Sequence, residues 1–510
     1  ARFNGMWAFA ILDRRTGAVF ASRDRFGVKP FFYRETKGEI LFASEMKAIL
    51  AAANEKPAMN GAFLYQYLDR AVPADPSETV FAGVRSLLPG HNLFIEQGSL
   101  RTERYWDFDL SRFRKSYDYT DPVATFRSLL VDAVRLRLRS DVPIGVCLSG
   151  GIDSSVIVGI ISGILERKVD VFSSVYAEEK YNEEEFLNAV LEKFPNTIHK
   201  ITPTPERFFP LLDEIVRHHD EPVRMPSTFS QWNIFTCVHE HDITVTLDGQ
   251  GADELLGGYR EYYPYYLATL LVDAVKGLNL KRFRLFLSTR RDLRTYLDRT
   301  YDKDVLRLLL PRWVLSLKRR LQPQRRWQDT VLRDDFIARY RRETLSDARA
   351  GDPRFPDLFS QRLFETFTRT NLPMVLDFED RISMAFSVEA RTPFLDYRVV
   401  EFCMGLSHEY KMDGYRNKAI LRDAFKDVLP EKVYSRKDKK GFPTPNEHWF
   451  RNEAREDLRA ILYSESLERH GVFDPKKVRD LFERHQRGEN HERMLFRVAS
   501  TELWMRRYLD

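Results

Sequence analysis

The sequence predicts an α/β protein in which a doubly wound parallel sheet with added helices follows a smaller antiparallel, β-rich region. Two patterns support this fold class. After residue 120, short apolar runs alternate with helical stretches. Before residue 110, paired apolar runs are joined by turns. The chain has 510 residues, of which 43% are hydrophobic and 30% charged, enough for two large folded domains.

The first part of the chain favours antiparallel strands. The paired runs are residues 6–12 with 18–22, and residues 31–34 with 40–43. Ser44 is placed to cap a helix that continues to Leu50. We expect a domain boundary near residues 110–120, so that residues 1–112 form the first domain.

After this boundary the chain alternates between predicted helices and predicted strands. Residues 123–138 have helical periodicity. Strand-like runs follow at residues 142–148, 169–176, 197–201 and 243–247. This alternation is typical of a parallel sheet covered by helices on both faces. We expect residues 120–510 to form the second domain, in which residues 261–373 are a basic helical insertion.

Charge and cysteine content exclude several classes of protein. A net charge of +5 does not by itself indicate a nucleic-acid or membrane partner. The basic excess is local, because residues 281–342 hold 19 basic and 7 acidic residues. An RNA-binding or RNA-modifying protein that uses this segment is an alternative, recognisable by steeply salt-dependent RNA binding. No apolar run approaches the roughly 18 residues that cross a bilayer. Three separated cysteines without a CxxC pair suit a reducing cytoplasm.

The sharpest signal is SGGIDSS at residues 149–155, directly after a strand-like run and before an apolar helix. Its glycines let backbone N–H groups approach a ligand closely, and its hydroxyls and helix N-terminus add donors and positive charge. The loop therefore predicts a cradle for phosphate or pyrophosphate. No lysine follows the glycines, which argues against γ-phosphate transfer of the P-loop type. An SGG turn can also be a plain loop, but the strand before it favours the nucleotide role.

A second glycine-rich junction reads LDGQGADE at residues 247–254, followed by Gly257 and Gly258. The carboxyl ends of parallel strands face one crevice, where ligands of open α/β sheets bind. We expect both loops to face that crevice. Asp153 and Asp253 could then share a Mg²⁺ ion, which prefers carboxylate and phosphate oxygens.

Several segments in order resemble known families. SGGIDSS resembles the pyrophosphate loop of the N-type ATP pyrophosphatases. DGQGADELLGGY, SMAFSVEARTPFLD and RKDKKGFPTP are similar to segments of the glutamine-hydrolysing asparagine synthetases. RDRFGVKPFFY and FASEMKAIL resemble the rear half of the glutaminase domain of that family, a class II amidotransferase with an antiparallel N-terminal-nucleophile-hydrolase fold. The resemblance covers nearly the whole chain apart from its variable middle.

This resemblance implies ATP-dependent amide formation with ATP and Mg²⁺ as cofactors. A carboxylate attacks the α-phosphorus of ATP to give an acyl-adenylate and pyrophosphate, and ammonia then displaces AMP. The implied substrates are small molecules: ATP, aspartate or another carboxylic acid, and glutamine or ammonia. A homodimer is a possible assembly. Pyrophosphate would be held by Ser149, Gly150, Gly151, Asp153 and Ser154, the adenosine part would contact Leu148, Ser174, Asp248 and Gly249, and Mg²⁺ would bind Asp153 and Asp253.

Two further positions are implied to be catalytic. Lys439 would lie on the α-phosphate, where a fixed cation offsets the charge that develops in the transition state. The neighbouring lysines 437 and 440 leave the register open, and a solvated basic loop is the alternative. Glu389 lies in a motif that frames the acceptor site, but with Arg391 it can equally form a structural ion pair. Lys418 is a weaker candidate for phosphate binding.

The chain departs from the family pattern at two positions. Residue 1 is alanine where the glutaminase has its nucleophilic cysteine, so we expect no glutamine hydrolysis by that route and interpret the chain as part of a longer protein. Gln250, at the third catalytic position, stands where asparagine synthetases have a glutamate that handles the proton of the incoming amine. A neutral amide cannot accept that proton. Either another group or water accepts it, or the acceptor is not free aspartate.

Other interpretations remain open at this point. An acceptor acid from a sugar, a peptide or the cell envelope is one, and a catalytically silent scaffold protein is another. The segments His218-His219-Asp220 and His239-Glu240-His241 are weak candidates for zinc, because no companion cluster accompanies them.

Overall fold

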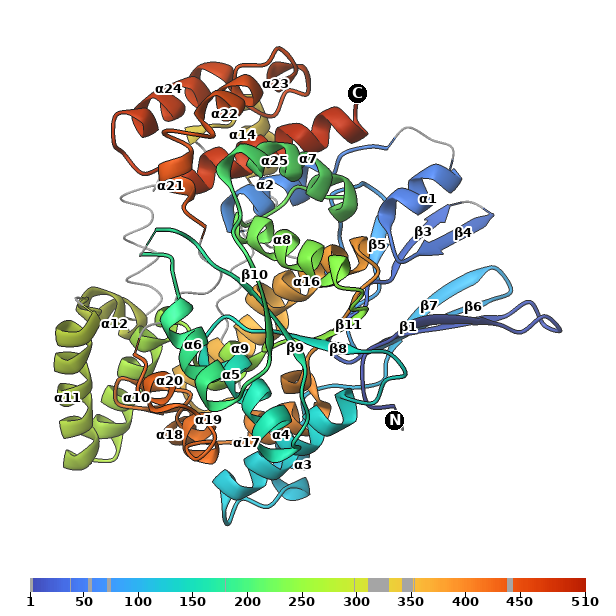
Figure 1. The fold of residues 1–510 in the computed structure, drawn as a ribbon. Helices are drawn as coiled ribbons and strands as arrows, with labels where there is room; N and C mark the ends of the chain where they lie inside the picture. The colour runs from blue at the N-terminus through green and yellow to red at the C-terminus, as the bar shows by residue number, and fades with distance from the viewer. Residues whose placement is uncertain are drawn as a thin grey trace.

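The computed structural model describes residues 3–36, 38–53, 57–70, 75–178, 180–297, 299–310, 330–341, 352, 354–437 and 444–510. Its first part contains two antiparallel sheets (Figure 1). One has the order β1-β2-β6-β7 and the other β4-β3-β5. Their strands are β1 (Ala8–Leu12), β2 (Val19–Arg23), β3 (Phe32–Thr36), β4 (Glu39–Ala43), β5 (Val84–Ser86), β6 (His91–Glu96) and β7 (Ser99–Arg104), and helices α1 (Met46–Ala53) and α2 (Gly61–Arg70) accompany them. Both predicted hairpins are confirmed, because β1 pairs with β2 and β3 pairs with β4.

The second part is built on a parallel sheet of five strands in the order β10-β9-β8-β11-β12. The strands are β8 (Ile144–Cys147), β9 (Asp170–Ser174), β10 (Thr197–Ile201), β11 (Val245–Leu247) and β12 (Glu389–Arg391). The first four were predicted, and β12 was not. The chain leaves β8 toward β9 and β10, and later returns to the other side of β8 through β11. Strands β8 and β11 are therefore the point where the strand order reverses, which is where open α/β sheets bind their ligands.

The two faces of this sheet pack against two different cores. Along β8, Val146 belongs to one core and Cys147 to the other, and on β9 Val171 and Phe172 alternate in the same way. The core on the Cys147 side includes α7 (Phe208–His219), α8 (Ser227–Glu240), α16 (Asn371–Ala385) and α25 (Glu492–Tyr508). The core on the Val146 side includes α4 (Pro122–Arg137), α5 (Ile152–Gly159), α17 (Tyr397–Gly405) and α19 (Ala419–Ala424). The sheet is doubly wound, as predicted, and the fold class is confirmed.

The remaining helices extend these cores. A third core joins α10 (Tyr263–Lys276), α11 (Leu280–Leu297), α12 (Asp302–Leu309) and α15 (Leu358–Glu365). The other α-helices and strands of the described residues are α3 (Leu110–Ser116), α6 (Glu184–Lys193), α9 (Ala252–Leu256), α14 (Asp334–Tyr340), α18 (His408–Lys411), β13 (Met412–Asp413), β14 (Arg416–Asn417), α20 (Glu431–Tyr434), α21 (Asn446–Trp449), α22 (Arg455–Leu462), α23 (Ser466–Arg469) and α24 (Pro475–Gln486). In the described part of the chain, no helix combines the length and the apolar character needed to cross a bilayer. The predicted domain limits and the insertion at residues 261–373 stay predictions.

Candidate active site

The SGGIDSS loop connects β8 to α5. Gly150 has a φ of 72°, and a Cβ atom there would lie 2.9 Å from the Cβ atom of Phe186, so the position favours glycine on both grounds. Ser149 folds the loop back on itself, because its hydroxyl accepts a hydrogen bond from the Gly151 N–H at 3.3 Å and contacts the Ser154 hydroxyl at 3.3 Å. The loop thus has the compact shape that presents N–H groups at a helix N-terminus.

The second loop follows β11, the strand next to β8. Its first residue, Asp248, accepts a hydrogen bond from the Gln250 N–H at 2.9 Å. A Cβ atom at Gly249 would lie 2.8 Å from the Cβ atom of Asp153, so the absence of a side chain lets the two loops touch. The structure therefore brings both predicted loops to the same edge of the sheet.

Asp153 and Asp253 converge on one buried cation. The Lys418 Nζ atom lies 2.7 and 2.5 Å from the two carboxylate oxygens of Asp153, and 2.6 Å from Oδ1 of Asp253. Only 3% of the Lys418 side chain is exposed. A Cβ atom at Gly258 would lie 1.7 Å from Asp253 Oδ1 and 2.3 Å from Lys418 Cε, so glycine is needed for this approach. Two carboxylates around one positive charge are a donor set that suits Mg²⁺.

The predicted Lys439 lies outside the described residues, but both flanks of its motif reach this edge of the sheet. Arg436 donates a hydrogen bond to the Gly150 carbonyl at 3.2 Å, and also pairs with Glu183. After the gap, Thr444 lies 2.9 Å from the Ser230 hydroxyl, which is 2.6 Å from the Tyr176 hydroxyl, two residues beyond the end of β9. The two described flanks of the motif thus lie beside the SGG loop and near the end of β9.

Of the other predicted site residues, two lie at the same edge of the sheet as the loops and one does not. Leu148 is buried directly after β8, and Ser174 ends β9 at the same edge as the loops. Glu389 is not brought to them. It begins β12 opposite Val245, at the amino end of β11, and accepts a hydrogen bond from Arg391 at 2.7 Å. In the structure Glu389 forms the ion pair that was its alternative interpretation.

A buried pair of carboxyl groups lies beneath the second loop. Asp248 and Glu379 are 5% and 4% exposed, and they lie close enough for each to affect the ionisation of the other. Burial raises the pKa of Asp248 to about 7. Burial, together with the neighbouring Asp248 charge, raises the pKa of Glu379 well above its ordinary value. Both shifts favour the protonated form of these two carboxyl groups.

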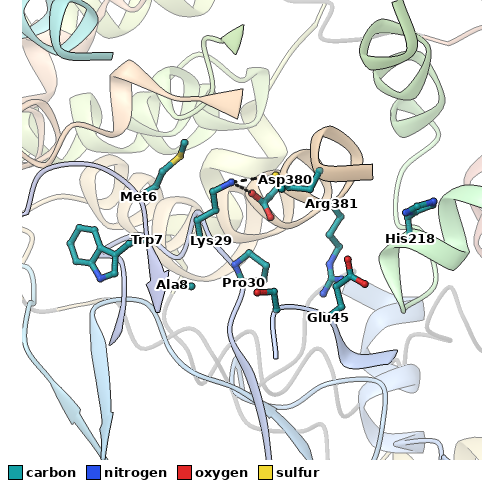
Figure 2. Close-up of a pocket in the computed structure, with 11 residues that line it drawn as sticks. Met6, Trp7, Ala8, Lys29, Pro30, Glu45, His218, Asp380 and Arg381 are labelled. Carbon is teal, nitrogen blue, oxygen red and sulfur yellow. Dashed lines mark hydrogen bonds and ion pairs between the residues drawn. The ribbon is translucent and has the colours of Figure 1, made fainter. Parts of the chain in front are cut away.

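A pocket lies between the antiparallel sheets and α16, and its lining includes Trp7, Lys29, Asp380 and Met384. Figure 2 shows Lys29 extended toward Asp380, and the two side chains form an ion pair of 2.6 Å. Asp380 is the neighbour of Glu379 on α16. One helix therefore links this pocket with the buried carboxyl pair.

The histidine segments form no metal site in the described part of the chain, where no group of three or more His, Cys, Asp or Glu side chains could hold an ion. Burial lowers the pKa of His219 to about 3, so its ring is neutral. Asp220 instead pairs with Lys47 at 3.0 Å and with Arg381 at 3.5 Å, which joins the first part of the chain to the second.

Sequence reasoning missed Arg436 and Glu379, and it gave Lys418 only a minor role. Lys418 is 265 residues from Asp153 in the chain, so no local spacing predicts their contact. Arg436 is the first residue of the RKDKKGFPTP motif, from which sequence reasoning selected Lys439 instead. Glu379 did leave a signal, since it is one of several charged residues on a helix that must pack against a core.

Comparison with known proteins decides the family. Residues 125–506 match the family described as asparagine synthase, and residues 1–106 match a glutamine amidotransferase domain. The chain belongs to the asparagine synthase family. The resemblance on which the sequence analysis relied is thereby confirmed.

Individual relatives include two proteins named as asparagine synthetases and one named as an amidase. The chain is 30% identical over 494 residues to asparagine synthetase [glutamine-hydrolyzing] 3 of Bacillus subtilis, covering 94% of this chain and 74% of that protein. It is 32% identical over 311 residues to putative asparagine synthetase [glutamine-hydrolyzing] 2 of Methanocaldococcus jannaschii, covering 60% of this chain and 59% of that protein. It is 24% identical over 534 residues to the amidase chyE of Penicillium rubens, covering 95% of this chain and 76% of that protein.

Membership in the asparagine synthase family settles the general activity. The chain is a carbon–nitrogen ligase of the glutamine-hydrolysing asparagine synthase type, as predicted. The family carries out ATP-dependent amidation of small-molecule substrates.

Proposed function

We propose that this chain activates a carboxylic acid, most simply aspartate, as an acyl-adenylate and converts it to an amide, with release of pyrophosphate and AMP. The observation that carries the proposal is the convergence of Asp153 and Asp253 on one cation where the strand order reverses. Mg²⁺ is the cation we propose for this donor set, where it would offset the negative charge of the nucleotide phosphates.

The protein groups have separate tasks in this proposal. N–H groups and hydroxyls of residues 149–154 bind the pyrophosphate part of ATP, since they lie at the N-terminus of α5. Lys418 and Lys439 stabilise phosphate charge as it moves from the α-phosphorus to the leaving pyrophosphate. Leu148, Ser174, Asp248 and Gly249 contact the adenosine part.

The compartment and the assembly are also proposals. The three cysteines, Cys147, Cys237 and Cys403, are buried and form no disulfide. Buried thiols without disulfides suit a reducing compartment, so we propose a cytoplasmic location. A homodimer is the proposed assembly.

Product analysis tests the main proposal. The chain is incubated with ATP, MgCl₂, aspartate and ammonium chloride, and pyrophosphate, AMP and asparagine are expected in equal amounts. Asp153→Asn should abolish all three products. Asp170→Asn is the matched control, because Asp170 begins β9 at the opposite edge of the sheet, and it should leave them unchanged. If no carboxylic acid yields AMP and pyrophosphate, the proposal is wrong.

A second candidate is amidation of a different acid, such as one of a sugar, a peptide or the cell envelope. Gln250 favours it, because it stands at the position of the family glutamate. Pyrophosphate release with another acid, and none with aspartate, would select this candidate.

A further inference from the structure

Gln250 raises the question of where the proton of the incoming nitrogen goes. An amine that attacks a carbonyl carbon becomes positively charged and must lose a proton, which a neutral amide cannot accept. The Gln250 side chain, however, points to a carboxyl group: its Nε2 atom lies 3.5 Å from Oε1 of Glu379. A carboxyl group is thus present beside Gln250, supplied by α16 rather than by the loop.

Glu379 is held in place by polar groups from other elements. Gln231 of α8 donates a hydrogen bond to Oε1 of Glu379 at 3.3 Å. Oε2 of Glu379 and Oδ2 of Asp248 are buried and find no N–H or O–H donor among the described residues. Since both atoms are acceptors, the two carboxyl groups can bond only by sharing a proton. The pair is therefore a site that stores and exchanges one proton.

Among the described residues, the ionisable groups with the largest effect on this pair are acidic. Asp380 of α16 and the Cys147 thiol of β8 are its neighbours, and Asp380 makes the charged form of Glu379 less favourable. Burial raises the pKa of Cys147 well above its ordinary value, so this thiol stays neutral. Each carboxyl group therefore binds a proton more strongly than an exposed carboxylate does, so its ionised form is a strong base.

The position of the pair fits the same role. Asp248 directly precedes Gly249, where a Cβ atom would lie 2.8 Å from the Cβ atom of Asp153, so the pair lies at the edge where the nucleotide is expected. Glu379 comes from the helix that lines the pocket shown in Figure 2, while its neighbour Asp380 faces that pocket.

We propose that Glu379, paired with Asp248, is the base that takes the proton of the incoming nitrogen. The inference rests on the proposed function. The nitrogen lone pair forms a bond to the acyl carbon, one N–H proton moves to the carboxylate, and the bond from carbon to the phosphate oxygen breaks so that AMP leaves with its electron pair. The sum is acyl-adenylate plus ammonia giving amide, AMP and a proton.

Separate half-reactions test this role. Exchange of labelled pyrophosphate into ATP in the presence of aspartate reports adenylate formation, and amide production with ammonium reports nitrogen attack. Glu379→Gln keeps the shape of the side chain and should lower amide production by about 10²–10⁴-fold, the range of general base catalysis. It should leave exchange within about threefold of wild type, because the base acts after adenylate formation. Glu502→Gln, another fully buried glutamate, is the control and should leave both rates unchanged.

A double variant makes the assignment sharper. Gln250→Glu returns a carboxylate to the loop, so Gln250→Glu with Glu379→Gln should recover most of the lost amide production. The proposal is overturned if Glu379→Gln preserves amide production, if it lowers both rates together, or if the double variant shows no recovery. Absence of exchange in the wild type with every acid tried would instead refute the proposed function, and this inference with it.

Discussion

Lys418→Met removes an ammonium group on which two buried carboxylates converge, while keeping the length of the side chain. Asp153 and Asp253 each have an oxygen within 2.6 Å of the Lys418 Nζ atom. Those oxygens are thus at most about 5 Å apart, and at an effective dielectric constant of about 20 their charges repel by about 3 kcal/mol. Breaking a buried ion pair costs about 3–5 kcal/mol. We expect the variant to lose about this much free energy of unfolding without divalent cations.

Mg²⁺ should reverse a large part of this loss. A ligand that binds only the folded state at about 100 times its Kd stabilises it by about 2.7 kcal/mol. The wild type should respond less, because Lys418 already neutralises the carboxylates. Urea unfolding in EDTA and in a MgCl₂ series measures both effects. Lys411→Met is the control, since Lys411 is also buried but has no contact with the two aspartates, and it should show no added response. Equal stabilisation of all three proteins by Mg²⁺ would refute the reasoning.

Three further predictions follow from the contacts. Burial favours the neutral form of Asp396, but hydrogen bonding by Arg398 keeps its pKa at about 2. Asp396→Asn should therefore lower the free energy of unfolding by about 2–3 kcal/mol at pH 7. In urea unfolding, this loss should disappear as the pH falls from 5 toward 2. Gly258→Ala displaces Asp253 and should lower pyrophosphate release by about 100-fold or more; unchanged release would contradict the contact. Burial raises the pKa of Asp248 to about 7, so ionisation of this side chain favours the unfolded state. The contribution of Asp248 to the free energy of unfolding is complete below pH 4 and is lost as the pH rises through 7. Asp248→Asn should therefore increase the free energy of unfolding at pH 8, and a decrease would contradict the raised pKa.

Local patterns were sufficient for most of the parallel sheet. Each predicted strand is a short apolar run, and β10 has the predicted limits of residues 197–201. β12 could not be predicted, because its sequence Glu-Ala-Arg is too short and too polar to indicate a strand. Its conformation follows from pairing with β11, a contact between segments more than 140 residues apart.

In the candidate site, too, local patterns predict some of the residues and tertiary packing determines the others. Both loops were predictable because glycines and acidic residues directly follow strand-like runs. Their joint edge also followed from the rule for parallel strands. The contacts of Lys418 and Glu379 depend on how distant helices pack, and single-sequence patterns do not encode that packing. Glu389 was selected through its motif, and its local ion pair with Arg391 was the alternative that the sequence already offered.

Isotope transfer tests the central claim most directly. Aspartate labelled with ¹⁸O in its side-chain carboxylate is supplied with ATP, MgCl₂ and ammonium, and the AMP formed is analysed by mass spectrometry. If the carboxylate attacks the α-phosphorus, each AMP carries one ¹⁸O atom, and the amide retains the other. AMP without label, formed together with asparagine, would contradict an acyl-adenylate at this site.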